Sequence, residues 1–350
     1  MLLDKILMYQ LGTIGKSLLD KAGLDKAPTS VAEMALFLQS VKDNVDKESF
    51  DGLLIGNIFF SFVTDEEVRD RQVTSRIFED IFSGLFSLIP TDRGTRRNPV
   101  AIEDLIKLDV LCNEDWRIST DLAGNKREKT DVHLGKYEVS LKTLKGQVYD
   151  EEGNIVDKSF NAELNVGSLS YRALLKGILT DDQISRLKDR KGGLGSAGQI
   201  RANMLNPIKE ARKQVEFSNR LNLFMKYVYS DDVFIVMKSH YQIKFILIPA
   251  ESFNQSIIDL YVKKENEFEN VWYRWENNNL RFRWVPMLNY MDEFALPYTV
   301  IDIDLSKAKS NKRVKDFLEK ISKSISESLQ ELVWKKPFLG LKNFSNIVRH

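Results

Sequence analysis

The segment KREKTDVHLGKYEVSLKTLKG, residues 126–146, contains the pattern that decides the fold. An acidic residue, Asp131, opens a short apolar run, and a tight turn at Gly135 and Lys136 separates this run from a second one. In the second run, residues 137–143, the side chains alternate between apolar and polar, which is typical of a β-strand with one buried face. The segment therefore predicts a β-hairpin within a sheet.

The polar residues of the second strand share one face of this hairpin: Glu138, Ser140 and Lys142. Val139 and Leu141 alternate with them, and we expect these two side chains to point into the core. Because the turn folds the second strand back beside the first, Asp131 is expected close to Ser140 and Lys142. A carboxylate with oxygen neighbours suits a hard cation such as Mg²⁺. A lysine beside it can position a water molecule and offset the charge of a phosphate, so the pattern favours phosphodiester hydrolysis.

Composition excludes several other kinds of site. The 350 residues include 51 Lys+Arg and 50 Asp+Glu, so a polyanion must bind a local basic patch rather than a generally positive surface. One cysteine, Cys112, excludes cysteine-ligated zinc, and three scattered histidines argue against a histidine-rich metal site. The cysteine usage predicts a cytoplasmic protein. No window has the length and hydropathy of a signal peptide or a membrane span.

The hairpin resembles the core of the PD-(D/E)xK nucleases, and of type II restriction endonucleases in particular. In that pattern, an acid at the start of one strand is followed on the next strand by a second acid, any residue and a lysine. Asp131 matches the first acid and Lys142 matches the lysine. The resemblance covers roughly residues 64–149. This range includes the helix before the hairpin, which carries Glu79 where this fold often has an additional acid.

Two positions depart from the family's pattern. Thr130 replaces the usual proline, and Ser140 replaces the second acid. In family branches with Ser-x-Lys, a carboxylate from elsewhere takes over. Glu79 is the first expectation and Glu138 the second. The full set of candidates consists of four glutamates: Glu79, Glu138, Glu151 and Glu152.

Three basic segments are candidates for DNA contact. The loop after residue 90 contributes Arg96 and Arg97. A predicted hairpin over residues 271–284 interleaves aromatic residues with three arginines: Arg274, Arg281 and Arg283. A glycine-rich run at 191–198 is flanked by phosphate-binding and base-reading side chains: Arg190, Lys191, Gln199, Arg201 and Asn203. A solvated loop or strand face is the alternative for each segment.

The whole chain predicts an α/β protein with a restriction-endonuclease-like mixed sheet flanked by helices. Residues 1–62 form a helical N-terminal region, 63–230 a nuclease core with DNA-contacting loops, and 231–350 a β-rich C-terminal region that ends in a helix. In the last region, alternation predicts strands at 233–237, 241–248, 271–275, 280–284 and 300–304. The stretch GTIGKS at 12–17 lacks the first glycine of a phosphate loop, so a nucleotide site is not expected there.

The resemblance implies a type II restriction endonuclease that uses Mg²⁺ to hydrolyse double-stranded DNA at a specific site. Asp131 with a glutamate would bind the metal, Lys142 would orient or help activate the water, and Ser140 would bind a metal-held water. Cutting both strands favours a homodimer, and a DNA methyltransferase is the expected functional partner. Two alternatives stay open: a non-catalytic DNA-binding or regulatory module that has lost the second acid, and a structural or assembly protein with an ordinary hairpin.

Overall fold

The computed structural model of the chain describes residues 5–62, 71–88, 132–134, 137–145, 148–149, 155–157, 163–166, 215, 218–219, 222, 231–239, 241–264, 267, 272–276, 279–306 and 311–335. For some of these residues, among them Glu138 and Lys142, only the course of the backbone is described.

The centre of the fold is a five-stranded mixed sheet in the order β1-β2-β6-β7-β10. Neighbouring strands are antiparallel except for β2 and β6, which run parallel. The strands are β1 (Val132–Leu134), β2 (Tyr137–Lys145), β6 (Asp232–Ser239), β7 (Gln242–Ile248) and β10 (Thr299–Asp304). The predictions of an α/β chain and of a mixed sheet flanked by helices are confirmed.

Two smaller sheets accompany the central one. One pairs β3 (Val148–Tyr149) with β4 (Ile155–Asp157). The other has the order β5-β9-β8 and contains β5 (Glu163–Val166), β8 (Trp272–Glu276) and β9 (Asn279–Arg283). The predicted hairpin at 271–284 is therefore present as β8 and β9, and β9 also pairs with a strand more than a hundred residues earlier in the chain.

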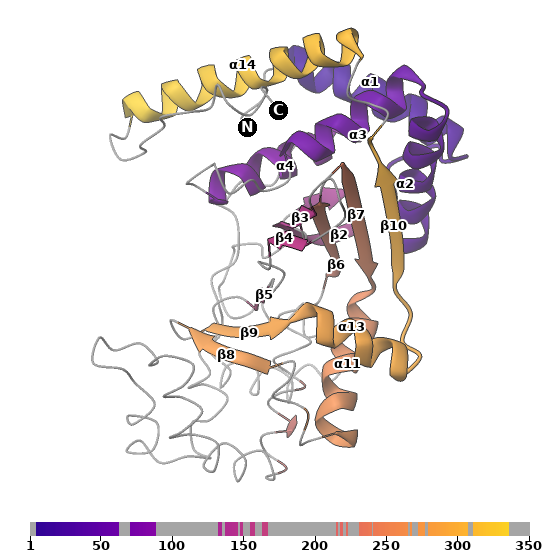
Figure 1. Cartoon of the computed structure of the whole chain (residues 1–350), viewed down its shortest axis with the longest axis vertical. Coiled ribbons are helices and arrows are strands. Elements are labelled where there is room, and N and C mark those ends of the chain that lie inside the picture. Colours follow the sequence, from indigo (N-terminus) through magenta and orange to yellow (C-terminus); the bar gives the residue numbers. More distant parts are fainter. Residues whose placement is uncertain are drawn as a thin grey trace, which may run out of the picture.

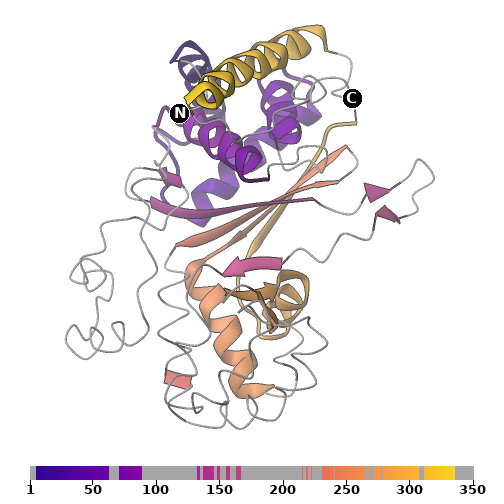
Figure 2. The same ribbon diagram turned by 90° about the vertical axis from the view of Figure 1, so that its left-hand side faces the viewer.

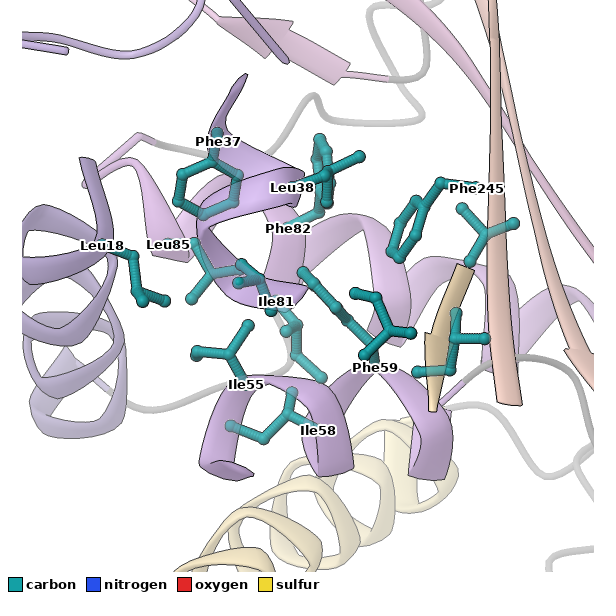
Figure 3. Packing of buried hydrophobic residues seen from close by; sticks show 14 of the residues in the cluster. Leu18, Phe37, Leu38, Ile55, Ile58, Phe59, Ile81, Phe82, Leu85 and Phe245 are labelled. Carbon is teal, nitrogen blue, oxygen red and sulfur yellow. The ribbon is translucent and has the colours of Figure 1, made fainter. Parts of the chain in front are cut away.

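A layer of helices covers one face of the central sheet (Figures 1 and 2). It consists of α1 (Lys5–Lys21), α2 (Val31–Asp46), α3 (Phe50–Phe62), α4 (Arg71–Leu85) and α14 (Lys312–Lys335). Their buried apolar residues form one cluster with residues from all five strands of the sheet. Figure 3 shows Phe59 of α3 beside Phe245 of β7, with ring centroids 5.2 Å apart. We call this surface the helical face of the sheet.

The opposite face of the sheet packs against α11 (Ala250–Lys263), and α13 (Trp284–Glu293) packs against α11 (Figure 2). Alternation places Val233 and Ile235 of β6 on this face, and both are fully buried. The sequence did not predict these two helices, and Trp284, expected at the end of a strand, begins α13. The C-terminal region thus contains the predicted strands and, in addition, two helices between them.

The GTIGKS stretch lies inside α1 and serves helix packing. A Cβ atom added to Gly12 would collide with Ser87, and one added to Gly15 would collide with the backbone of Leu85. The two glycines therefore allow α1 and the end of α4 to approach closely. Close packing of the two helices therefore explains why this stretch contains two glycines although it does not form a phosphate loop.

The three predicted regions, 1–62, 63–230 and 231–350, remain a prediction, although their described parts meet in one core. Leu54 of α3, Val139 of β2 and Ile303 of β10 belong to the same hydrophobic cluster. Among the helices that the structure describes, none combines the length and the hydropathy needed to cross a bilayer.

Candidate functional site

The hairpin predicted from residues 126–146 is formed by β1 and β2. The two strands are antiparallel, with His133 opposite Glu138 and Leu134 opposite Tyr137. Leu134 and Val139 are buried in the cluster on the helical face of the sheet. Because side chains alternate along a strand, the even-numbered residues of β2 face the other way.

The predicted polar row of β2 therefore exists as a row of backbone positions. Ser140 is half-buried, and Glu138 and Lys142 are the flanking positions of the same parity. On the parallel neighbour β6, Val233 pairs with Ser140 and Ile235 pairs with Lys142. The row thus lies at the border of the apolar core beneath α11. Asp131, which directly precedes β1 in the sequence, lies outside the described residues.

Glu79 occupies a different place in the fold. It lies in α4 and is 5 % exposed. Its helix neighbours Phe78 and Phe82 belong to the cluster on the helical face of the sheet, whereas Ser140 faces away from that cluster. The structure therefore does not bring Glu79 to the face that carries Ser140. Glu151 and Glu152 lie outside the described residues.

Tyr137, at the start of β2, is tied to the start of β6. Its hydroxyl donates a hydrogen bond of 2.6 Å to Oδ2 of Asp232. The other carboxylate oxygen, Oδ1, accepts a hydrogen bond of 2.8 Å from the backbone N–H of Ala250, the first residue of α11. Burial, reinforced by the bond to Asp232, raises the pKa of the Tyr137 hydroxyl far above its usual value. Asp232 thus links β2, β6 and α11 and satisfies a free N–H group at the helix start.

A second aspartate next to this link was missed by the sequence analysis. Asp231 directly precedes β6, the parallel neighbour of β2, and is 5 % exposed. The signal was the pair Asp231-Asp232 at the start of a strand predicted from residue 233. Its closeness to the hairpin depends on the parallel pairing of β2 with β6, which the sequence pattern did not indicate.

Of the predicted DNA contacts, only the arginines of the β8–β9 hairpin lie in described strands. Arg274 and Arg281 are opposite each other, and Arg283 is opposite Glu163 of β5. The remaining candidates lie outside the described residues: Arg96, Arg97, Arg190, Lys191, Gln199, Arg201 and Asn203.

In the part of the chain that the structure describes, no three side chains of His, Cys, Asp or Glu come together as a set that could hold a metal ion. Carboxylate and hydroxyl oxygens are the ligands that Mg²⁺ prefers, and the sequence of the hairpin contains both types of side chain. The expectation of Mg²⁺ therefore depends on the donor chemistry of the hairpin, including Asp131.

Comparison with known proteins finds a distant similarity to a nuclease. Over 135 residues, 39 % of this chain, the sequence is 26 % identical to ribonuclease HII of Picrophilus torridus. The aligned segment spans 64 % of the length of that protein, so somewhat less than two thirds of the relative is represented. No family model matches the chain, and the search of solved structures finds no match.

Proposed function

We propose that this protein is a Mg²⁺-dependent nuclease of the restriction-endonuclease type, which hydrolyses double-stranded DNA at a specific site. The observation that carries the proposal is the β1–β2 hairpin, whose polar positions Glu138, Ser140 and Lys142 share one face. Val139 and Leu141, buried on the other face, hold this strand in place. The similarity to ribonuclease HII independently supports the broader class, a hydrolase that acts on nucleic acid.

In this proposal Asp131 and Glu138 bind the metal. Asp131 directly precedes Val132 in the sequence, and Val132 is paired with Val139 of β2. A bound Mg²⁺ supplies Lewis-acid stabilisation of the phosphate and lowers the pKa of a bound water. Lys142 orients the attacking water and offsets the negative charge that develops on the phosphate. Ser140 donates or accepts a hydrogen bond to a water near the metal.

We propose Glu138 rather than Glu79 as the partner of Asp131. Positions 138 and 140 of β2 have the same parity, so these two backbone positions lie on the same face of the sheet. Glu79 belongs to α4, whose buried residues pack on the helical face of the sheet. A ligand on the opposite face would have to reach around the edge strand β1 to meet the same ion.

We further propose how the protein binds DNA. Arg274, Arg281 and Arg283 of the β8–β9 hairpin contact phosphates. The glycine-rich run at 191–198 and the loop with Arg96 and Arg97 provide base-reading and further phosphate contacts. A homodimer would present two hairpins to the two strands of one site. A DNA methyltransferase of matching specificity would protect the host DNA.

RNA is a second candidate substrate, favoured by the similarity to a ribonuclease. The proposed metal chemistry acts on a phosphodiester and does not itself select the sugar. Selection would come from contacts with the 2′-hydroxyl or from the shape of the duplex. The choice between DNA and RNA is therefore an outcome of the experiment below.

The test is a cleavage assay with the purified full chain. Supercoiled plasmid DNA, RNA duplex and DNA–RNA hybrid are incubated with Mg²⁺ or with EDTA. We expect Mg²⁺-dependent fragments of defined length from the plasmid, and loss of cutting in Asp131→Ala and Lys142→Ala. Cleavage of an RNA-containing substrate alone would favour the second candidate. Intact plasmid that nevertheless shifts on a gel would favour a non-catalytic binding module, and neither effect would favour a structural protein.

A further inference from the structure

The first residue of β2, Tyr137, is joined through a single carboxylate to the first residue of α11. The Tyr137 hydroxyl donates a hydrogen bond of 2.6 Å to Oδ2 of Asp232. The other oxygen of this carboxylate, Oδ1, accepts a hydrogen bond of 2.8 Å from the backbone N–H of Ala250. We call these three residues the β2–α11 link.

The link holds a part of β2 that the strand pairing with β6 does not reach. This pairing begins at Val139, opposite Asp232, so Tyr137 lies before it. On the side of β6, Tyr137 is held by its own side chain. Its ring meets Phe234 edge-on, with the centroids 6.2 Å apart, and its hydroxyl reaches Asp232. The link therefore fixes the end of β2 from which the strand continues to Ser140.

The chemistry of the link makes it a firm connection. Hydrogen bonds to a carboxylate are short and about twice as strong as those between neutral groups. Burial, together with the bond to Asp232, raises the pKa of the Tyr137 hydroxyl, so this group remains a donor throughout the neutral pH range. The carboxylate of Asp232 accepts both of its bonds at the same time, so β2 and α11 are held to the same group.

The helix at the other end of the link is connected to the β8–β9 hairpin. Lys264, which caps the C-terminus of α11, forms an ion pair of 2.6 Å with Glu293 of α13. The hydroxyl of Tyr290, also in α13, donates a hydrogen bond of 2.7 Å to Glu267. Because α13 begins at Trp284, directly after the last residue of β9, the two helices and the hairpin follow one another without a break (Figures 1 and 2).

We propose that Tyr137 and Asp232 are positioning residues, which hold β2 in a fixed place relative to α11, α13 and the β8–β9 hairpin. The inference rests on the proposed nuclease function, in which β2 carries the catalytic row and the hairpin contacts phosphates. A substrate held by the hairpin then presents its scissile phosphate to β2 in one orientation. Because a misplacement of about 1 Å can slow a reaction about 100-fold, loss of the link slows cleavage while the substrate still binds.

The experiment compares Tyr137→Phe with Tyr298→Phe. Tyr298 is the matched control, because its hydroxyl donates a similar bond, 2.7 Å long, to Asp292 beside β10, at the other edge of the sheet. Each protein is assayed at a temperature at which thermal unfolding shows it to be folded. The substrate is supercoiled plasmid, or the RNA-containing duplex if the wild type cleaves that instead.

Two quantities are measured for each protein: the single-turnover cleavage rate at saturating protein with Mg²⁺, and the Kd for the same substrate in EDTA. For Tyr137→Phe we expect a rate about tenfold lower or less, and a Kd within about twofold of that of the wild type. For Tyr298→Phe we expect both quantities to stay within about twofold of the wild type. A purely structural link would lower the Tm and leave the rate of the folded protein unchanged.

The outcomes separate this inference from the proposed function. A folded Tyr137→Phe protein that cleaves at the wild-type rate, or equal losses of rate in the two variants, overturns the positioning role alone. A wild type that neither binds nor cleaves nucleic acid overturns the nuclease function itself. Where Tyr137→Phe does not fold, Asp232→Asn is the second test, since its amide has one accepting oxygen and must give up one of the two bonds. A wild-type rate in folded Asp232→Asn also overturns the role.

Discussion

The two faces of the central sheet differ in how far their apolar surface extends. On the helical face, each of the five strands contributes buried apolar residues to one cluster. On the opposite face, the buried residues come from β6 and β7, while Ser140 on β2 is half-buried and Asp302 and Asp304 on β10 are exposed. One face alone can therefore fix the strands. This leaves the outer strands of the other face free to carry polar groups.

The largest effect is expected in the core on the helical face. Phe59 is fully buried and contacts three aromatic rings: Phe78, Phe82 and Phe245. Phe59→Ala would leave a cavity and lower the free energy of unfolding by about 3–5 kcal/mol. Urea denaturation measures this loss. The control on the opposite face is Val300→Ala, at a residue that is 43 % exposed, with an expected change within about 0.5 kcal/mol. Equal losses in the two variants would contradict the difference between the faces.

A smaller loss is expected where α1 packs against α4. In Gly15→Ala, the added methyl group would collide with the backbone of Leu85, so the helices must separate. Overpacking of this kind costs about 1–3 kcal/mol, and this is measured as a fall in unfolding free energy. Thr13→Ala, at an exposed position of the same helix, is the matched control and should change stability by less than about 0.5 kcal/mol. A neutral Gly15→Ala would show that this contact is loose.

The link between β2 and β6 should have a moderate and pH-dependent effect. Tyr137→Phe removes the hydrogen bond to Asp232 and leaves an acceptor without this donor, which costs about 1–2 kcal/mol near neutral pH. Because the pKa of Tyr137 is raised in the folded state, its stabilising contribution is complete below the unfolded pKa of about 10 and declines above it.

The difference between wild type and Tyr137→Phe should therefore shrink above pH 10, by up to about 1.4 kcal/mol per pH unit. Chemical denaturation between pH 7 and pH 11 measures this difference. A gap between the two proteins that stays constant over this range would contradict the buried, protonated state of the hydroxyl.

The smallest effect is expected on the exposed part of the face opposite the helical face. Lys244 and Asp302 form an ion pair of 3.5 Å between β7 and β10, with 40 % and 49 % of the side chains exposed. Exposed pairs of this kind contribute less than about 1 kcal/mol and are screened by salt. A double-mutant cycle with Lys244→Ala and Asp302→Ala should give a coupling below about 0.5 kcal/mol. A coupling of 2 kcal/mol would show that this face also stabilises the fold.

Local patterns in the sequence were sufficient to predict the strands of the central sheet and of the β8–β9 hairpin, but not β4 and β5. Alternation predicted β2, β6, β7 and β10 to within a few residues, and the short turn predicted the pairing of β8 with β9. The same local reasoning could have found α11, because Phe253, Ile257 and Leu260 follow a helical spacing. Pro249 precedes this helix without a side-chain cap, so the usual signal of a helix start is absent.

Other features depended on contacts between distant parts of the chain. Trp284 continues the alternation of β9, yet α13 begins there, with Pro286 in the first turn, where proline is tolerated. The position of Asp231 depends on the parallel pairing of Ser140 with Val233. No local pattern specifies which strands become neighbours. The first expectation for the second acid, Glu79, lies in α4 on the helical face of the sheet, a placement that the sequence pattern did not indicate.

The central claim is that the polar row of β2 catalyses hydrolysis, and two lysines of this strand test it most directly. Lys142 has the parity of Ser140, whereas Lys145 has the opposite parity and pairs with Lys238. Initial rates of Mg²⁺-dependent plasmid cleavage are measured for Lys142→Ala and Lys145→Ala, after thermal unfolding has shown that the two variants have the same Tm. The account predicts a loss of about 100-fold or more for Lys142→Ala and a change of a few-fold at most for Lys145→Ala. Wild-type cleavage by Lys142→Ala, or equal losses in both variants, would contradict it.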